Sequence, residues 1–356
     1  MLELLIKKTL GNFSLQSTFT AKNGVLGILG PSGCGKSMTL KCIAGLQTPD
    51  SGLIRLNDKL LFSSEFKIDI PSRKRNIGYV FQHYALFPHM TVMNNIGYGV
   101  KHLEKKQRIQ KIKRMIERMQ LDGLEDHYPS QLSGGQQQRT ALARTLITEP
   151  DLLLLDEPFS ALDSHIKHLL EKELISIIKN NFDGIVLLVT HNIEEAYRIC
   201  DHIMIMDKGN NLQYGTKDDI VHTPANLTTA RITGCKNLLD VTVLKETDQH
   251  LILKSNELIF KAIKPKLKPS KIKVAGIRSH HISFCSDSHN NDNTFECTII
   301  DKINGVFSTI IVVNCKRCIL QVELSKMSCP HIHKCNSSKL MLHIPPHQVF
   351  VMDKDE

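Results

Sequence analysis

The sequence predicts an α/β domain built on a mostly parallel sheet, followed by a smaller β-rich domain. Three observations lead to this prediction. Short apolar runs alternate with helical patterns from residue 1 to about 234, as in a sheet that helices cover on both faces. A glycine-rich loop joins one of these runs to a helix-forming segment. From about residue 238 onward, short β-like runs replace the helical patterns, at 239–244, 271–277, 294–300, 309–313 and 319–324. We therefore expect domains at 1–234 and 235–356.

The first diagnostic element is the loop Gly30–Ser37, which reads GPSGCGKS and fits the phosphate-loop pattern G-x-x-x-x-G-K-[ST]. It follows the apolar run 25–29 and precedes a segment at 38–44 that can form a helix. Glycines let backbone N–H groups point at phosphate oxygens, and a helix N-terminus adds partial positive charge. Lys36 would reach the β- and γ-phosphates, and Ser37 would hold Mg²⁺. The loop predicts nucleotide binding.

Next along the chain, the apolar run 77–81 ends at Gln82. A neutral amide at a strand end can touch Mg²⁺ or an attacking water, although a surface glutamine would look the same.

The segment 101–128 has a different composition, with one apolar stripe among many charged residues. It predicts an amphipathic helical insertion away from the sheet, for which we expect no function of its own. The stripe consists of Ile109, Ile112, Ile116 and Met119.

The most specific segment is Leu132–Gln136, which reads LSGGQ. Ser133 and the two following glycines open a helix, so they offer a hydroxyl and close N–H groups to an anion. Glycines also tolerate the close approach of a second body. A lone Ser-Gly-Gly would be weak evidence for any function.

Two further strands end in polar residues. The apolar run 152–155 leads into Asp156 and Glu157, where Asp156 would assist Mg²⁺ and Glu157 would orient or deprotonate a water. After a helical pattern over 166–178, the run 185–189 leads to Thr190 and His191. A histidine at this rim of a parallel sheet predicts a contact with the γ-phosphate.

Together these residues resemble the nucleotide-binding subunits of ATP-binding cassette (ABC) transporters. The resemblance covers residues 1 to about 234, adds the D-loop Ser160–Asp163, and places all six motifs in the family's order. It implies a P-loop NTPase cassette with a RecA-like core, a helical subdomain at about 83–150, and a C-terminal OB- or MOP-like β-barrel with a regulatory role. The aromatic residue expected to stack on adenine is a departure, because Phe13 is only the nearest candidate.

The resemblance implies ATP and Mg²⁺ as cofactors and assigns three sets of residues. The catalytic residues would be Glu157, His191 and Gln82, and the residues at the metal would be Ser37, Gln82 and Asp156. The nucleotide would be bound by Gly30, Pro31, Ser32, Gly33, Cys34, Gly35, Lys36, Ser37, Met38, Ser133, Gly134, Gly135, Gln136, Asp163 and Phe13.

The family mechanism implies three kinds of protein partner. Each ATP would lie between the phosphate loop of one chain and the signature of another, so the chain would pair head to tail with a second copy. The dimer would drive transmembrane permease subunits at the cytoplasmic face of the membrane, with an extracytoplasmic substrate-binding protein as an indirect partner. We expect no nucleic acid as a partner.

The stretch 83–92, aromatic and apolar, resembles the importer groove that receives a permease helix, and local core packing is the alternative explanation. The segments 233–237 and 276–282 resemble molybdate and sulfate transporter ATPases, and the segment 9–13 resembles molybdate ATPases. We therefore expect import of molybdate or tungstate. The alternatives are sulfate, iron(III), polyamine or sugar import and, more distantly, a soluble ABC ATPase acting on nucleic acid or ribosomes.

Composition agrees with a globular chain of about two domains, with 356 residues, 41% hydrophobic residues and a net charge of +9. We expect no signal peptide and no membrane span, and we expect the ten cysteines to be free cytosolic thiols. One cluster could instead hold zinc, although its spacing is not that of a standard site. It comprises Cys315, Cys318, Cys329, His331, His333 and Cys335.

Overall fold

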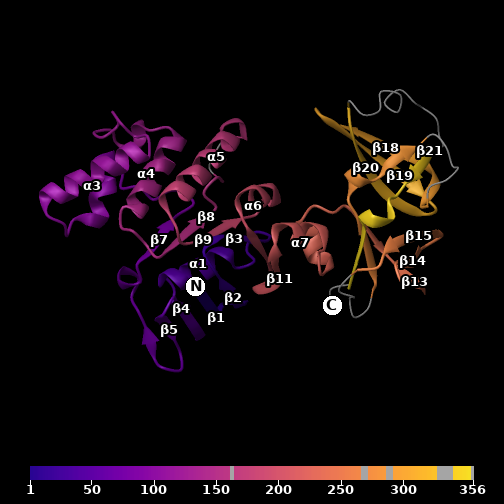
Figure 1. The fold of residues 1–356 in the computed structure, drawn as a ribbon, viewed down its shortest axis with the longest axis horizontal. Helices are drawn as coiled ribbons and strands as arrows, with labels where there is room; N and C mark the ends of the chain where they lie inside the picture. Colours follow the sequence, from indigo (N-terminus) through magenta and orange to yellow (C-terminus); the bar gives the residue numbers. More distant parts are fainter. Residues whose placement is uncertain (161–163, 266–271, 286–291, 327–339, 354–356) are drawn as a thin grey trace. The chain divides into compact units, whose positions relative to one another are not determined.

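The computed structural model describes residues 1–160, 164–265, 272–285, 292–326 and 340–353 (Figure 1). The chain divides into two compact units, Met1–Lys217 and Asp218–Glu356. This division falls earlier than the boundary expected near 234, because the short helices before that residue group with the strands that follow. Each unit is described by itself.

Within the described residues, the first unit is built on one eleven-stranded sheet with the order β6-β5-β4-β1-β2-β11-β10-β3-β9-β8-β7. Its strands are β1 (Leu2–Leu10), β2 (Phe13–Ala21), β3 (Gly24–Leu29), β4 (Ser51–Leu56), β5 (Lys59–Ser63), β6 (Ile68–Asp69), β7 (Ile77–Val80), β8 (Leu152–Asp156), β9 (Ile185–Thr190), β10 (His202–Asp207) and β11 (Asn210–Thr216).

Five neighbouring strands, β10, β3, β9, β8 and β7, run parallel and form the central part of the sheet. Every residue of β8 and β9 is buried, as expected for strands covered on both faces. Because parallel strands end at the same edge, the loops that follow β3, β8 and β9 meet there. The predicted α/β class is confirmed, and this edge is where the site must lie.

The antiparallel part of the sheet was not predicted. Strands β1, β2, β4, β5 and β6 pair antiparallel with one another. The signal was present in β1, where Leu2, Leu4 and Ile6 are buried and alternate with more exposed residues, as in a strand with one covered face.

The helices of the first unit follow the predicted pattern, with the amphipathic insertion as α3. In Figure 1, α3 and α4 lie apart from the antiparallel strands β1, β4 and β5. Among the described residues, we find no helix with both the length and the apolar character needed to cross a membrane. The elements are α1 (Lys36–Ala44), α2 (Val92–Gly97), α3 (Lys105–Arg118), α4 (Gly134–Leu146), α5 (Ser164–Asn181) and α6 (Ile193–Ile199), with 3₁₀ turns η1 (Ser72–Lys74), η2 (Tyr98–Val100) and η3 (Pro129–Gln131).

In the second unit, short helices precede three sheets, and strands occur at each of the five runs expected after residue 238. The sheet orders in its described part are β12-β16-β22, β13-β14-β15 and β17-β21-β18-β19-β20. Alternate apolar residues of these strands form one core. The elements are α7 (Lys217–His222), α8 (Leu227–Ile232), β12 (Asn237–Asp240), β13 (Thr242–Glu246), β14 (His250–Ser255), β15 (Leu258–Ile263), β16 (Val274–Ile277), η4 (Ser279–His281), β17 (Ser283–Cys285), β18 (Thr294–Asn304), β19 (Ser308–Cys315), β20 (Cys318–Ser325), β21 (Leu340–His343), η5 (Pro346–Gln348) and β22 (Val349–Met352).

Candidate functional site

The phosphate loop connects β3 to α1, and its shape depends on glycine at two positions. Gly35 is the N-cap residue of α1 and has a φ of 110°, a left-handed conformation that L side chains rarely adopt. Gly30 lies so close to the carbonyl oxygen of Met206 that a Cβ there would collide with it. The loop therefore keeps its backbone close to the sheet edge and at the N-terminus of α1.

Lys36 is 5% exposed and lies under this loop. Its ammonium donates to the carbonyl oxygens of Gly30 at 2.8 Å and Pro31 at 2.9 Å. Both acceptors are neutral, so the positive charge stays available to an anion bound by the loop. These residues fit a nucleotide phosphate.

A carboxylate and a hydroxyl meet at the end of β8. Ser37 Oγ donates to Asp156 Oδ1 at 2.7 Å, and Tyr79 Oη donates to Asp156 Oδ2 at 2.8 Å. Asp156 is 7% exposed. Hard oxygen ligands of this kind are those that Mg²⁺ takes beside nucleotide phosphates. The oxygen atoms of Ser37 and Asp156 therefore fit the predicted metal, whereas the role of Tyr79 was not foreseen.

Glu157 and His191 follow neighbouring strands, and the structure brings them together. Glu157 Oε2 lies 3.4 Å from His191 Nδ1. The glutamate has a φ of 45°, and its backbone N–H donates to Val189 O at 3.0 Å. This bond fixes the turn after β8 against β9. A carboxylate with an imidazole at this distance can accept a proton from water while the imidazole orients it.

Gln82 lies in the turn after β7 and is exposed.

Phe13 at the start of β2 lies beside the phosphate loop. A Cβ on Gly35 would come within 3.1 Å of the Phe13 ring. A hollow of about 480 Å³ opens there, and its lining includes Phe13, Ser32, Gly33 and Cys34. The hollow places an aromatic ring next to the loop, as adenine stacking would require. Burial raises the pKa of the Cys34 thiol.

The signature residues lie elsewhere in the first unit. Ser133 is the N-cap of α4, where its Oγ accepts from Gln136 N at 3.3 Å and its N–H donates to Gln136 Oε1 at 2.8 Å. This reciprocal capping box fixes the helix start. Gly134 is exposed. In Figure 1, α4 is separated from α1, so one chain does not bring its own signature to its own phosphate loop. Asp163 lies outside the described residues.

The stretch after Gln82 is tied to the helical subdomain. Arg144 on α4 donates to the carbonyl oxygens of Tyr84 at 2.9 Å and Ala85 at 2.8 Å, and its guanidinium lies 5.1 Å from the centre of the Phe87 ring. The Phe87 ring lies 4.5 Å from that of Tyr98, which is 44% exposed. Tyr84 itself is buried and belongs to the core.

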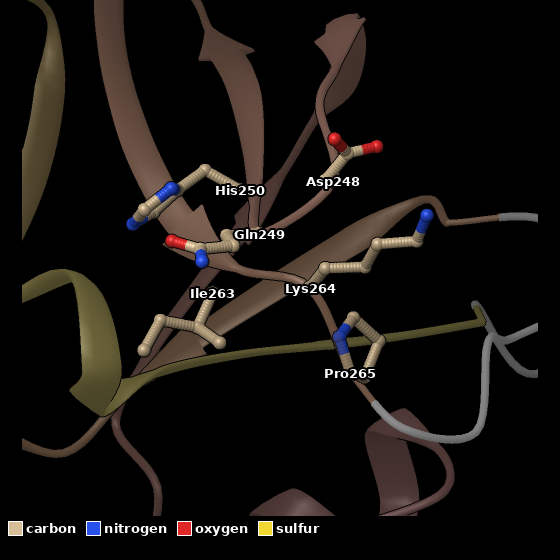
Figure 2. Close-up of a pocket in the computed structure, with 6 residues that line it drawn as sticks. All are labelled: Asp248, Gln249, His250, Ile263, Lys264 and Pro265. Atoms are coloured by element: carbon tan, nitrogen blue, oxygen red, sulfur yellow. The ribbon is translucent and has the colours of Figure 1, made fainter.

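A second hollow, of about 390 Å³, lies in the second unit beside the ends of β14 and β15 (Figure 2). The ammonium of Lys264 pairs with Glu246 at 2.8 Å. In Figure 2, the Lys264 and Asp248 side chains point away from the His250 ring and the Gln249 amide. Because these polar groups do not converge, the hollow gives no support for oxyanion binding here.

Two of the thiols proposed for a zinc site, Cys315 and Cys318, face each other across the β19–β20 hairpin as buried free cysteines. The other members of the proposed site, at 329–335, lie outside the described residues. In the part of the chain that the structure describes, no group of three or more histidine, cysteine and carboxylate side chains could hold a metal ion. The zinc site stays without support.

The sequence and the structure of this chain are similar to those of known proteins. A family model described as ABC transporter matches residues 15–160. The sulfate/thiosulfate import ATP-binding protein CysA of Vibrio vulnificus is 44% identical over 225 residues, which are 61% of this chain and 62% of the relative. The Fe(3+) ions import ATP-binding protein FbpC of Haemophilus influenzae is 41% identical over 66% of this chain and 65% of the relative. The match to CysA thus spans less than two thirds of that relative.

A third relative matches further into the second unit. The spermidine/putrescine import ATP-binding protein PotA of Aggregatibacter actinomycetemcomitans is 36% identical over 311 residues, 82% of this chain and 81% of the relative. Among solved structures, cbiO1 of Clostridium perfringens, described as part of the ABC transporter complex cbiONQ, has a TM-score of 0.54 at 26% identity over 62% of this chain and 89% of that one. An ATP-binding cassette solved as a dimer with ADP and Pi has a TM-score of 0.51 at 26% identity, over 61% of this chain and 99% of that one.

Proposed function

We propose that this chain, which belongs to the ATP-binding subunits of ABC transporters, hydrolyses ATP to drive the import of a solute through membrane permease subunits. The observation that carries the proposal is the meeting of Lys36, Asp156 and the Glu157–His191 pair at one edge of the parallel sheet. Three strands deliver these groups to one place, where ATP and Mg²⁺ would be held.

The chain's own residues have distinct roles in this proposal. Loop N–H groups and Lys36 would bind the phosphates, while Ser37, Asp156 and Gln82 would hold Mg²⁺, which would supply charge neutralisation at the transferred phosphoryl group. Glu157 accepts a proton from the attacking water. His191, 3.4 Å from the Glu157 carboxylate, orients that water and contacts the γ-phosphate.

The separation of Ser133 from Lys36 supports a head-to-tail dimer. A closed twofold arrangement brings the same two surfaces together twice, so two copies would complete two equal sites. The solved relative described as a dimer with ADP and Pi supports a dimer for this chain as well. Closing on ATP and opening after hydrolysis would provide the motion that the permease uses.

The surface that would receive the permease is the stretch after Gln82. Arg144 holds its backbone carbonyls, and the rings of Phe87 and Tyr98 lie together with part of the tyrosine exposed. A fixed aromatic surface suits the apolar face of a short helix. The chain would thus sit on the membrane peripherally, with an extracytoplasmic binding protein delivering the solute to the permease.

The predicted substrate, molybdate, has no support among the relatives reported above, whose names refer to sulfate/thiosulfate, Fe(3+) ions and spermidine/putrescine. We propose sulfate or thiosulfate as the substrate to test first, because the CysA relative has the highest identity of the three. Iron(III) and polyamines are the next alternatives. Uptake of labelled sulfate, spermidine, iron and molybdate in cells lacking this chain, with and without its gene restored, separates these substrates.

The ATPase itself is tested by the Glu157→Gln variant. The amide keeps the shape of the side chain but cannot take a proton, so turnover should fall by about 100-fold or more. Binding of ATP should persist and the dimer should accumulate. Glu149→Gln is the matched control, because that carboxylate is 78% exposed in a surface pair with Lys111. Phosphate release within twofold of the wild-type rate in Glu157→Gln would reject the assignment of the base.

A further inference from the structure

We propose that Tyr79 is a positioning residue that holds the Asp156 carboxylate in the orientation that Mg²⁺ requires; this inference rests on the function proposed above. The Tyr79 hydroxyl donates to Asp156 Oδ2 at 2.8 Å, while Ser37 donates to Oδ1 at 2.7 Å. The two hydroxyls thus donate hydrogen bonds to the two different oxygens of one buried carboxylate.

The sheet register explains why Tyr79 can reach this aspartate. In the parallel pair of β7 and β8, Tyr79 is the partner of Leu154. Side chains two residues apart on a strand share a face. Asp156 therefore lies on the same face as Leu154, two residues further toward the site. The long phenol ring spans that step. The contact therefore follows from the register and needs no special loop conformation.

The ring of Tyr79 is itself held in place. It packs against the hydrophobic core of the first unit, and its centroid lies 4.3 Å from that of Phe81 in a stacked arrangement. A phenol hydroxyl carries its proton at neutral pH, so Tyr79 acts as a donor to the Asp156 carboxylate. A fixed ring and a permanent proton give the carboxylate one defined partner.

This partner matters most when the metal is bound. Mg²⁺ would bind a lone pair of the Ser37 oxygen, and the Ser37 hydroxyl could still donate its proton to Asp156 Oδ1. Tyr79 would fix the other oxygen, Oδ2, so that the carboxylate presents one orientation to the metal. Hydrogen bonds to charged acceptors are stronger than those between neutral groups, and outer partners of metal ligands commonly set metal affinity.

Tyr79→Phe tests the inference, because it removes the hydroxyl and keeps the ring. Binding of a fluorescent ATP analogue is measured while Mg²⁺ is titrated, in the Glu157→Gln background to prevent turnover. We expect the Mg²⁺ concentration for half-maximal binding to rise about 10-fold or more. Affinity for the analogue in EDTA should stay within about twofold of the value for the same background, since a purely structural loss would lower both.

Tyr84→Phe is the matched control. It removes another buried phenol hydroxyl, whose partner is the Pro158 carbonyl oxygen at 3.4 Å and not Asp156. Its Mg²⁺ dependence should match that of the background chain. An unchanged Mg²⁺ dependence in Tyr79→Phe, or an equal shift in Tyr84→Phe, would overturn the inference. If the wild-type chain neither binds nor hydrolyses ATP, the proposed function fails instead.

Discussion

Asp156 and Glu157 are adjacent carboxylates with different surroundings. Asp156 is buried at the end of β8 and accepts hydrogen bonds from two hydroxyl groups. Glu157 turns out of the strand with a positive φ and faces His191. The first environment fixes the orientation of a carboxylate that would bind Mg²⁺, and the second places a carboxylate beside an imidazole, where it would meet the attacking water. The change of backbone conformation between them separates the two roles.

His281 in η4 leads to a prediction on pH and stability. Within the described residues, its buried Nδ1 has no hydrogen-bond partner. Burial first, and then the nearby His280, Arg278, His222 and His347, lower the pKa of His281 from 6.5 to about 4. Between these values the unfolded chain binds a proton that the folded chain does not. Stability should therefore be full above pH 6.5 and fall as the pH drops toward 4.

Calorimetry of the full chain at several pH values measures this effect. His281→Gln cannot be protonated, so its melting temperature should fall less between pH 6.5 and 5 than that of the wild type. His250→Gln is the control, because His250 is the first residue of β14 in the same unit, where its backbone N–H donates to Thr247 Oγ1. Parallel melting curves for wild type and His281→Gln across this range would contradict the prediction.

Most residues of the candidate site could be predicted, because they directly follow an apolar run or, like Lys36, lie in the glycine-rich loop that follows one. The positions of Lys36, Asp156, Glu157 and His191 at one edge follow from that pattern. The contact of Tyr79 with Asp156 could not be predicted, because it joins residues 77 positions apart and depends on the register of β7 against β8. Alternation in sequence does not fix which residues of two parallel strands are neighbours.

At the scale of the element, α1 is anchored at both ends. Its N-terminus carries the phosphate loop, and its C-terminus is bound by Arg75, whose guanidinium is fully buried. Arg75 donates to the carbonyl oxygens of Cys42 at 2.9 Å and Ile43 at 2.8 Å, and also to Ile70 O and Asp69. These bonds satisfy carbonyls that a helix end leaves free. The sequence offered no signal for this residue.

Arg75→Ala should therefore destabilise the first unit by about 3 kcal/mol, because it leaves buried carbonyls without donors and opens a cavity. Asp69→Asn should cost less than about 1 kcal/mol, since the Asp69 side chain is 44% exposed and the other bonds of Arg75 remain. Urea denaturation, read from the transition of the first unit, measures both. Equal losses in the two variants would show that the salt bridge, and not the helix end, is what Arg75 supports.

At the scale of the element, only some strands of the second unit were predicted from the sequence. The predicted runs 294–300 and 309–313 lie within β18 and β19, but β14 and β15 were not predicted. These two strands are short, and their burial alternates within six residues. Runs of this length carry too few apolar residues to distinguish a strand from a loop by pattern alone.

At the scale of the whole molecule, one chain would hold only half of each ATP site. Lys36 and Glu157 lie at the sheet edge, whereas Ser133 opens α4 in a separate part of the first unit. A variant lacking either half is expected to be inactive alone. Ser133→Asp is suited to this purpose, because aspartate also caps helices but places a negative charge against the γ-phosphate.

The most direct test is to mix the two inactive variants Lys36→Ala and Ser133→Asp in equal amounts and to measure ATP hydrolysis. In a mixed dimer, one site has an intact phosphate loop from one copy and an intact signature from the other. With random pairing, activity should rise to about a quarter of the wild-type value. If the mixture stays at the level of the separate variants while both still bind to a wild-type copy, each chain does not complete its partner's site, and the account is contradicted.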